Sequence, residues 1–501
     1  MTTRVRRSAA AAVVLTVSIA TGVLASPQPP HESTSYVTRA LPPAAPVATD
    51  FNGRNDDYEP AVAVGGDGTR WVVANIMQTA AVDTTTTPPS SRKGPDSREL
   101  ELLSGADVWR STDNGRTFRW LTSLFTTNGT APGTGGEDSD IAVAPQRNPS
   151  TSRYNVYVVS NWVASASVAI STDGGSTWQT MALGGVEPLT DRPYVTADGP
   201  CTFYITYHAL QAASVAVNRY DACGGASAPA TPVPGQPLDP AAGVDATLDA
   251  AALVNRIGKP VVDPVSHALY VPMLQCDSTS VTAHEGDATS SSGCGGRGEV
   301  VVAVSRDGAS TFALKHVAYV ADGRVPTWGV SAAVGRHGRL FVSWSDDVHA
   351  YVAMSPDGAS TWSVPARMDL AQTRAVYPTL AVGPAGDLAA AWYQADATSW
   401  PHGDVDANAA PSDATWRFVI ATSSDGVHWR PDVLPAVVHA GPVCTYGTAC
   451  SSDTRALYDN LGLAMGSDGT VTAAYMDDQP GGTIAADHVV YSTSYRVRSA
   501  R

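Results

Sequence analysis

Charged and aromatic side chains gather at seven places in a chain that is otherwise poor in charge. Only 16% of the 501 residues are Asp, Glu, Lys or Arg, yet nearly all of these places combine carboxylates, arginines or tyrosines. Arginine binds carboxylates through two parallel hydrogen bonds, and carboxylic acids and tyrosines can transfer protons or attack a substrate. The seven segments are Asn55–Glu59, Glu137–Ser139, Leu189–Arg192, Asn255–Lys259, Val325–Gly329, Thr373–Tyr377 and Arg455–Asn460.

A short run of small and β-branched residues follows each of these segments. After a turn comes a bulkier second run, and then a third. Short apolar runs between turn residues are typical of strands, and no stretch after the N-terminal region has convincing helical periodicity. The seven first runs are Pro60–Val64, Asp140–Ala144, Pro193–Ala197, Pro260–Asp263, Val330–Val334, Pro378–Val382 and Leu461–Met465.

Three or four antiparallel strands repeated along the chain predict an all-β fold, a single β-propeller. Counting the first strands gives seven blades, with six blades as the alternative. A β-helix has shorter and more regular repeats, and a two-sheet sandwich does not explain a sevenfold unit. The last unit is short, so we expect Ser35–Val47 or Tyr495–Val497 to complete it and close the ring, which removes exposed strand edges.

The turn after the third strand carries a repeated motif, Ser-x-Asp-x-Gly-x-Thr-aromatic. Ser111–Phe118 and Ser171–Trp178 match it fully, while Ser305–Phe312, Ser355–Trp362 and Ser423–Trp429 are close matches. An Asp side chain can accept hydrogen bonds from N–H groups of its own turn, and Gly permits positive φ. We therefore interpret the motif as a structural hairpin turn. The third and seventh units lack it.

These motifs resemble the Asp-box repeats, also called bacterial neuraminidase repeats. Sialidases carry such repeats, as do other propeller proteins such as xyloglucanases and sortilin-type receptors. The resemblance covers most of the chain at the level of the repeat and implies a β-propeller of the sialidase superfamily. It does not by itself imply sialidase activity, because function depends on the site and not on the fold.

The resemblance also implies what a catalytic site would need. A sialidase uses three arginines to clamp the sugar carboxylate, a carboxylic acid at the leaving group, and a tyrosine nucleophile beside a carboxylate. The family's Arg-Ile-Pro motif is absent here, because the matching place reads Tyr58-Glu59-Pro60, so candidates are assigned by position alone. They are Arg192, Arg256, Arg374, Tyr458, Asp191 and Glu59, with Arg54 as an alternative arginine and Asp459 as an alternative partner of Tyr458.

Three functions stay open from these residues. The first is an extracellular exo-glycosidase resembling sialidases, and the second is a non-catalytic propeller that binds glycan or protein. The third is a glycosidase that uses two carboxylates across the channel without arginines. Alternatively, the same arginines and carboxylates pair with one another and tie neighbouring blades together.

The N-terminus has the pattern of a secretory signal, with basic residues before the apolar run Ala9–Ala20 and a small-residue cleavage site at Val23–Ala25. We expect residues 1–25 to be removed, 26–50 to form an N-terminal segment with the candidate closing strand, and 51–501 to form the propeller. The mature protein is then extracellular. Six cysteines agree with an oxidising compartment, where the simplest pairing is between neighbours: Cys201–Cys223, Cys276–Cys294 and Cys444–Cys450.

Charge and motif content narrow the expected partners. A formal net charge of −15 disfavours nucleic acid and anionic membrane surfaces. No segment after the signal is apolar for long enough to span a bilayer, and no spacing typical of a zinc site or phosphate loop occurs. We therefore expect no metal and no cofactor, an extracellular carbohydrate or protein ligand, and a monomer.

Overall fold

Seven β-sheets account for nearly all regular structure in the described part of the chain. The computed structural model describes residues 37–42, 57–76, 105–126, 135–162, 165–182, 190–209, 214–224, 228–233, 255–276, 298–320, 329–398, 410–445, 457, 460–478 and 489–496. These residues all belong to the unit Tyr36–Arg501. The predicted signal, residues 1–25, lies outside them. Their one helical element is the 3₁₀ turn η5 (Arg336–Gly338), and within the described ranges no helix has the length and apolarity needed to cross a membrane.

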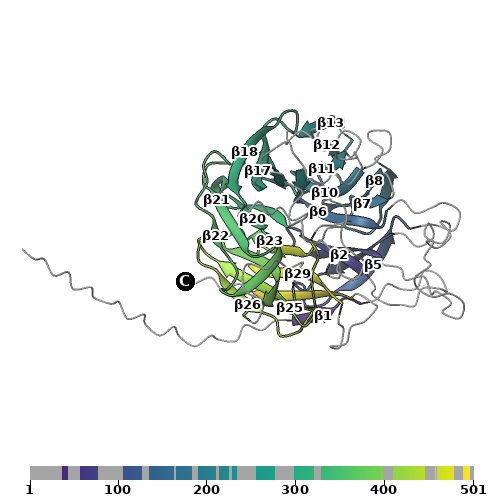
Figure 1. Cartoon of the computed structure of the whole chain (residues 1–501). Helices are drawn as coiled ribbons and strands as arrows, with labels where there is room; N and C mark the ends of the chain where they lie inside the picture. The colour runs from purple at the N-terminus through teal and green to yellow at the C-terminus, as the bar shows by residue number, and fades with distance from the viewer. Residues whose placement is uncertain are drawn as a thin grey trace, which may run out of the picture. The chain divides into compact units, whose positions relative to one another are not determined.

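Each sheet is one antiparallel blade of a propeller, as predicted, and the blades follow one another around a ring in chain order (Figure 1). The inner strands of blades one to seven are β2 (Asp57–Val64), β6 (Glu137–Arg147), β10 (Thr190–Asp198), β14 (Asn255–Ile257) with β15 (Val261–Val262), β19 (Val330–Val334), β23 (Thr373–Val382) and β28 (Gly462–Met465). The second strands are β3 (Arg70–Ile76), β7 (Tyr154–Trp162), β11 (Thr202–Ala209), β16 (Leu269–Cys276), β20 (Leu340–Ser345), β24 (Leu388–Asp396) and β29 (Thr470–Asp477).

The outer half of each blade is built from two further strands. The third strands are β4 (Ala106–Ser111), β8 (Ser165–Ser171), β12 (Ser214–Asp221), β17 (Gly298–Ser305), β21 (Ala350–Ser355), β25 (Thr415–Ser423) and β30 (Val489–Arg496). The outermost strands are β5 (Arg119–Leu124), β9 (Gln179–Ala182), β13 (Ala228–Val233), β18 (Ala313–Tyr319), β22 (Ala366–Arg367), β26 (Arg430–Val433) with β27 (His439–Ala440), and β1 (Val37–Ala40).

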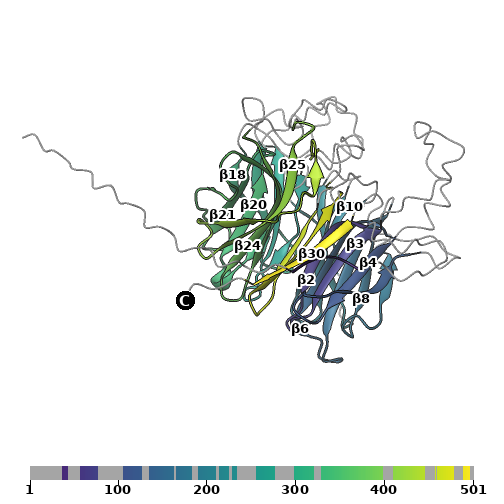
Figure 2. The ribbon, with the colours of Figure 1, turned by 90° about the horizontal axis from the view of Figure 1, so that it is seen from below.

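The seventh blade is assembled from both ends of the described chain. Strand β1 pairs antiparallel with β30, with Val37 opposite Ser494 and Ala40 opposite Tyr491. The sheet order is therefore β1-β30-β29-β28. Blade seven lies directly beside blade one, and Figure 2 shows yellow β30 next to purple β2. This pairing closes the ring.

Hydrophobic side chains fill the interfaces between neighbouring blades. Val73 and Val108 of blade one pack with Ile141 and Val158 of blade two, and the other interfaces hold equivalent clusters. Both faces of a middle strand are thus covered, and all seven residues of β3 are buried. This explains why the second strands read as continuous apolar runs and not as alternating ones.

The predicted hairpin turns share one hydrogen-bonding scheme. In blade one, Ser111 Oγ donates to Asp113 Oδ1 at 2.7 Å and accepts the N–H of Gly115 at 3.0 Å. Asp113 also accepts the N–H of Thr117 at 2.9 Å and its hydroxyl at 2.6 Å. The scheme recurs in the turns that begin at Ser171, Ser305 and Ser355, and in a shorter form at Ser423. We call these five the Ser-x-Asp turns.

A Ser-x-Asp turn packs against the blade that precedes it. At Gly175 in blade two, an added Cβ would lie 2.3 Å from the ring of Trp71 in blade one, and the φ of Gly175 is 85°. Glycine is the residue that fits both conditions. Ala309 and Ala359 hold the same place in later blades with φ of 68° and 71°, and their methyl groups are buried in the clusters between blades.

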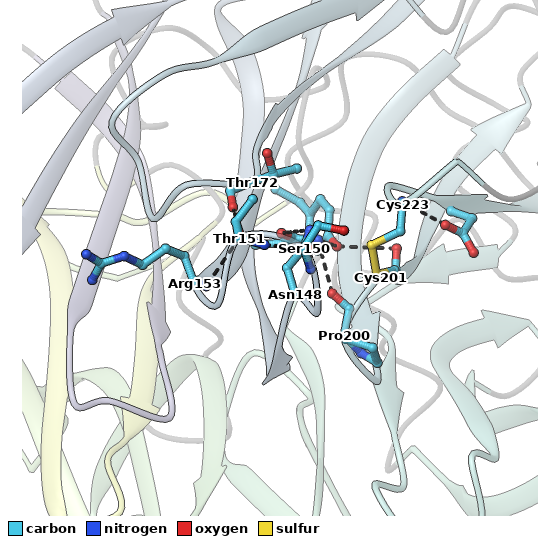
Figure 3. Close-up of a disulfide and its surroundings, with 11 residues drawn as sticks. Asn148, Ser150, Thr151, Arg153, Thr172, Pro200, Cys201 and Cys223 are labelled. Carbon is cyan, nitrogen blue, oxygen red and sulfur yellow. Dashed lines mark hydrogen bonds between the residues drawn. A yellow bond between two sulfur atoms is a disulfide. The ribbon is translucent and has the colours of Figure 1, made fainter.

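In blade three, a disulfide occupies the corner where a Ser-x-Asp turn would lie (Figure 3). Cys201 precedes β11 and Cys223 follows β12, and their Cα atoms are 5.6 Å apart. The strand register brings them together, because Thr202 is paired with Asp221. The predicted Cys201–Cys223 pairing is confirmed. Cys294 and Cys450, the expected partners of the other two pairs, lie outside the described residues.

This corner also contacts the preceding blade. Asn155 Nδ2 of blade two donates to the carbonyl of Pro200 at 3.0 Å, and the Tyr157 hydroxyl donates to the carbonyl of Cys201 at 3.3 Å. The disulfide therefore takes the place of a Ser-x-Asp turn in two respects. It holds the end of the blade together and presents a fixed backbone to the neighbouring blade.

The close approach of Gly175 to Trp71 gives a first prediction. Gly175→Ala is expected to lower the free energy of unfolding by about 2–4 kcal/mol, because the new methyl group overlaps the ring and the backbone stays left-handed. Gly174→Ala is the matched control: its φ is 74°, but its nearest neighbour is 4.0 Å away, so a loss of only about 1–2 kcal/mol is expected. Equal losses in urea unfolding would contradict this packing.

The blade-three disulfide gives a second prediction. Replacing both cysteines, as Cys201→Ala with Cys223→Ala, should lower the free energy of unfolding by about 2–4 kcal/mol, because the unfolded chain is no longer cross-linked. Denaturant unfolding of the double variant beside the wild type measures the loss. Peptide mapping of the unreduced wild type must find the two cysteines joined, and finding them as free thiols would refute the assignment.

Candidate functional site

The five predicted site residues that the structure describes lie inside the inner strands and not in loops before them. In four blades a two-residue bulge interrupts the pairing of the inner strand with the second strand. The first bulge residue has left-handed φ in each case: 52° at Glu59, 47° at Asp138, 51° at Arg192 and 55° at Tyr377. Such backbone is uncommon outside glycine, and strain of this kind collects at functional sites.

Three of these bulges are joined through one arginine. Arg192 Nη2 lies 3.2 Å from Glu59 Oε1, and Arg192 Nε lies 3.0 Å from Asp138 Oδ1. The side chains of Arg192 and Glu59 are each only 2% exposed. Buried charges are costly unless they are paired. The pairing of Arg192 therefore ties blades one, two and three together at their inner edges.

A buried asparagine holds two of the bulges in position. Asn75, in β3, donates from Nδ2 to Glu59 Oε2 at 3.1 Å and accepts the N–H of Ser139 at 2.9 Å. It is fully buried. Asn75 thus orients the Glu59 carboxylate and fixes the backbone beside Asp138.

Asp191 extends the cluster toward solvent. Its carboxylate lies 3.8 Å from Nδ1 of His208, the residue opposite it in β11. Burial by itself would raise the pKa of Asp191, but the nearby His208 and the charge of Arg192 lower that pKa from 3.8 to about 2. Asp191 is 29% exposed. We call Glu59, Asp138, Asp191, Arg192 and His208 the channel-mouth cluster.

The cluster adjoins a cavity on the propeller axis. The cavity holds about 370 Å³ and is lined by inner-strand residues of all seven blades, mostly small and aliphatic. The lining begins within the bulge of blade one, at Pro60, and directly after the bulges of blades two and three, at Asp140 and Tyr194. The Tyr194 hydroxyl reaches across to Asn460 Oδ1 before β28, at 3.5 Å, and burial raises its pKa. The cluster therefore lies at the end of the channel where the inner strands begin.

A second charged network lines the wall of the channel. Lys259 Nζ lies 2.7 Å from Asp140 Oδ1 and donates to the carbonyl of Ile141 at 2.7 Å. Asp140 Oδ2 accepts the N–H of Val195 at 2.9 Å. This network links blades two, three and four. Together with the contacts of Arg192, this network connects the first four blades through polar side chains.

The other predicted candidates lie elsewhere on the ring. Arg256 is in β14 of blade four, and Arg374 is in β23 of blade six, where its Nη1 donates to the carbonyl of Thr373 at 3.1 Å. Both are buried, at 1% and 7% exposure. Tyr458 lies outside the described residues. Of the six candidates, Glu59, Asp191 and Arg192 come together in one cluster, while a three-arginine clamp and a tyrosine nucleophile stay predictions.

Sequence reasoning missed Asn75, Asp138 and His208 as site residues. Asn75 and His208 are polar residues at the ends of apolar second strands, and their positions opposite Tyr58 and Asp191 are signals that a strand alignment could have used. Asp138 occupies the same bulge position as Arg192. That equivalence was hidden because the apolar run of blade two was counted from Asp140, after the bulge, whereas the runs of blades one and three begin inside it, at Pro60 and Pro193.

Comparisons with known proteins return similar structures of low identity. No protein-family model matches this chain, and no curated protein matches it. A protein of unknown function from Dyadobacter fermentans is 13% identical over 92% of this chain and 100% of its own, with a TM-score of 0.43.

Two enzymes are among the similar structures. The α-L-arabinanase of Penicillium chrysogenum is 13% identical over 72% of this chain and 94% of its own, with a TM-score of 0.43. The NanB sialidase of Streptococcus pneumoniae is 11% identical over 90% of this chain and 70% of its own, with a TM-score of 0.39. At such low similarity, neither activity nor substrate transfers to this chain.

The lowered pKa of Asp191 gives a third prediction. A carboxyl group with a depressed folded-state pKa stabilises the fold above its unfolded pKa, about 3.9, and this contribution is lost as the pH falls toward about 2. Asp191→Asn should therefore reduce the free energy of unfolding near neutral pH by on the order of 1–2 kcal/mol. Unfolding curves of variant and wild type should converge between about pH 4 and pH 2. A constant difference across that range would refute the assignment.

Proposed function

We propose that this protein is exported and binds glycan at the channel-mouth cluster. The observation that carries the proposal is the joining of Glu59 and Asp138 by Arg192, all three on left-handed bulges at one end of the channel. Carboxylates accept hydrogen bonds from sugar hydroxyls, and a fixed network presents them in one orientation. The Cys201–Cys223 disulfide supports export, because such bonds persist in oxidising compartments.

The adjoining channel supports a small-molecule or glycan-end ligand over a flat protein surface. Its volume of about 370 Å³ and its lining, which combines small aliphatic side chains with polar groups such as Asp140, Lys259 and Asn460, are typical of ligand sites. Aliphatic walls can cover the C–H faces of a sugar while the cluster bonds its hydroxyls. A ligand would then contact the inner strands of several blades together.

Hydrolysis is a second candidate function, favoured by the two carboxyl groups of the cluster that solvent reaches, Asp138 and Asp191. Glycosidases use such a pair, one group as the acid at the leaving group and the other to stabilise positive charge on the sugar. Asp191, held ionised by His208 and Arg192, fits the second role. Asp138 would have to take up a proton to act as the acid, and its pairing with Arg192 favours the ionised form, so binding is the primary proposal.

Glycan binding is tested by calorimetry against a panel of oligosaccharides, with two matched variants. Asp191→Asn should weaken binding about tenfold or more, because a hydrogen bond to a charged group is lost. Asp198→Asn, at the other end of the same strand, removes a carboxylate that pairs with His267 away from the cluster, so affinity should not change. Equal effects of the two substitutions, or no binding of any glycan by the wild type, would refute the site.

Hydrolysis is tested on the same proteins with a panel of aryl glycosides. Turnover by the wild type that falls about 10²–10⁴-fold in Asp191→Asn, and not in Asp198→Asn, would establish it. Glycan binding without turnover of any substrate would leave the protein as a binding propeller.

A further inference from the structure

We infer that the channel-mouth cluster selects neutral saccharides and discriminates against acidic ones, an inference that rests on the proposed glycan site. Recognition of an acidic sugar needs a guanidinium or ammonium group that the sugar carboxylate can reach. The described residues place carboxylates, not arginines, where a ligand arrives.

Among the described residues, the arginines at the start of the inner strands are withdrawn from solvent. Arg192 uses its Nε–Nη2 edge on Asp138 and Glu59. Arg256 and Arg374 are also buried, at 1% and 7% exposure. To pair with Arg192, a ligand carboxylate would have to displace a protein carboxylate. The displaced carboxylate would then be buried without a positively charged partner, which is costly.

The members of the cluster that solvent reaches are both acids. Asp191 and Asp138 have exposed area, whereas Glu59, Arg192 and His208 are almost completely covered. Lys259, a half-buried cation on the channel wall, directs its ammonium at Asp140 and the Ile141 carbonyl. An approaching carboxylate therefore meets like charge first, while hydroxyl groups meet acceptors.

The overall charge acts in the same direction. The chain carries 47 acidic and 32 basic residues, so the long-range field also disfavours an anionic ligand. The local repulsion and this field are both electrostatic, and both weaken in salt. Salt dependence therefore reports the mechanism without any change to the protein.

The test uses sugar pairs that differ in charge: lactose beside sialyllactose, and neutral oligosaccharides beside uronic-acid counterparts of the same linkage. For every pair in which binding is detected, the wild-type protein in low salt should bind the neutral member at least about tenfold more tightly than the acidic member. Raising the ionic strength from about 0.05 M to about 0.5 M should strengthen binding of the acidic member and leave binding of the neutral member unchanged, so that the affinity ratio falls. Asp191→Asn should narrow it as well, and Asp198→Asn should leave it unchanged.

Each outcome decides a different statement. Equal or tighter binding of the acidic members overturns the inference and leaves the glycan site standing. Binding of neither member of any pair overturns the proposed function and the inference with it. A neutral preference that does not change with salt also overturns the inference, because the discrimination would then be steric and not electrostatic.

Discussion

The antiparallel pairing of β1 with β30 is the contact on which the rest of the molecule depends. It supplies the outermost strand of blade seven from the opposite end of the chain. Without it, the last blade would have an open edge and its packing against blade one would weaken, although Val62 and Val72 meet Ala474 and Val490 there. A closed ring fixes the position of every blade relative to its neighbours. That is the condition under which side chains from several blades can share one site.

The channel-mouth cluster draws on this rigidity in a direct way. Left-handed backbone at non-glycine residues and buried charges each cost free energy, and they persist only where surrounding structure holds them. Strand pairing continues on both sides of each bulge, and Asn75 links the bulges of blades one and two. Arg192 then pairs with two carboxylates on other blades, and its single positive charge offsets part of theirs. The strain and the charge compensation support each other, and the result is a preorganised group of acceptors at the end of the channel.

The opposite corners of the blades meet a similar demand through different chemistry. Five blades use a Ser-x-Asp turn, whose side-chain hydrogen bonds shape the hairpin that docks on the preceding blade. Blade three uses the Cys201–Cys223 disulfide, and the same corner accepts hydrogen bonds from Asn155 and Tyr157. The common requirement is a rigid corner whose backbone is held in a fixed position against the preceding blade. Hydrogen bonds or a covalent bond can both provide it, which explains why the motif is absent from a blade that otherwise fits the repeat.

The sequence by itself predicted a repeat of seven units, with six blades as the alternative, together with the order of strands within a unit and the place of the Ser-x-Asp turns. These features depend on local periodicity and on hydrogen bonds between residues at most four positions apart. It also pointed to Glu59, Asp191 and Arg192. Only the tertiary structure decided that Arg192 meets Glu59, 133 positions away, and that Asp138, Asn75 and His208 complete the site. The bulges that aim these side chains have no sequence signature beyond a frequent following proline. Which charges become buried partners is decided by the closed ring, since Coulomb energy and desolvation depend on distances that no local pattern contains.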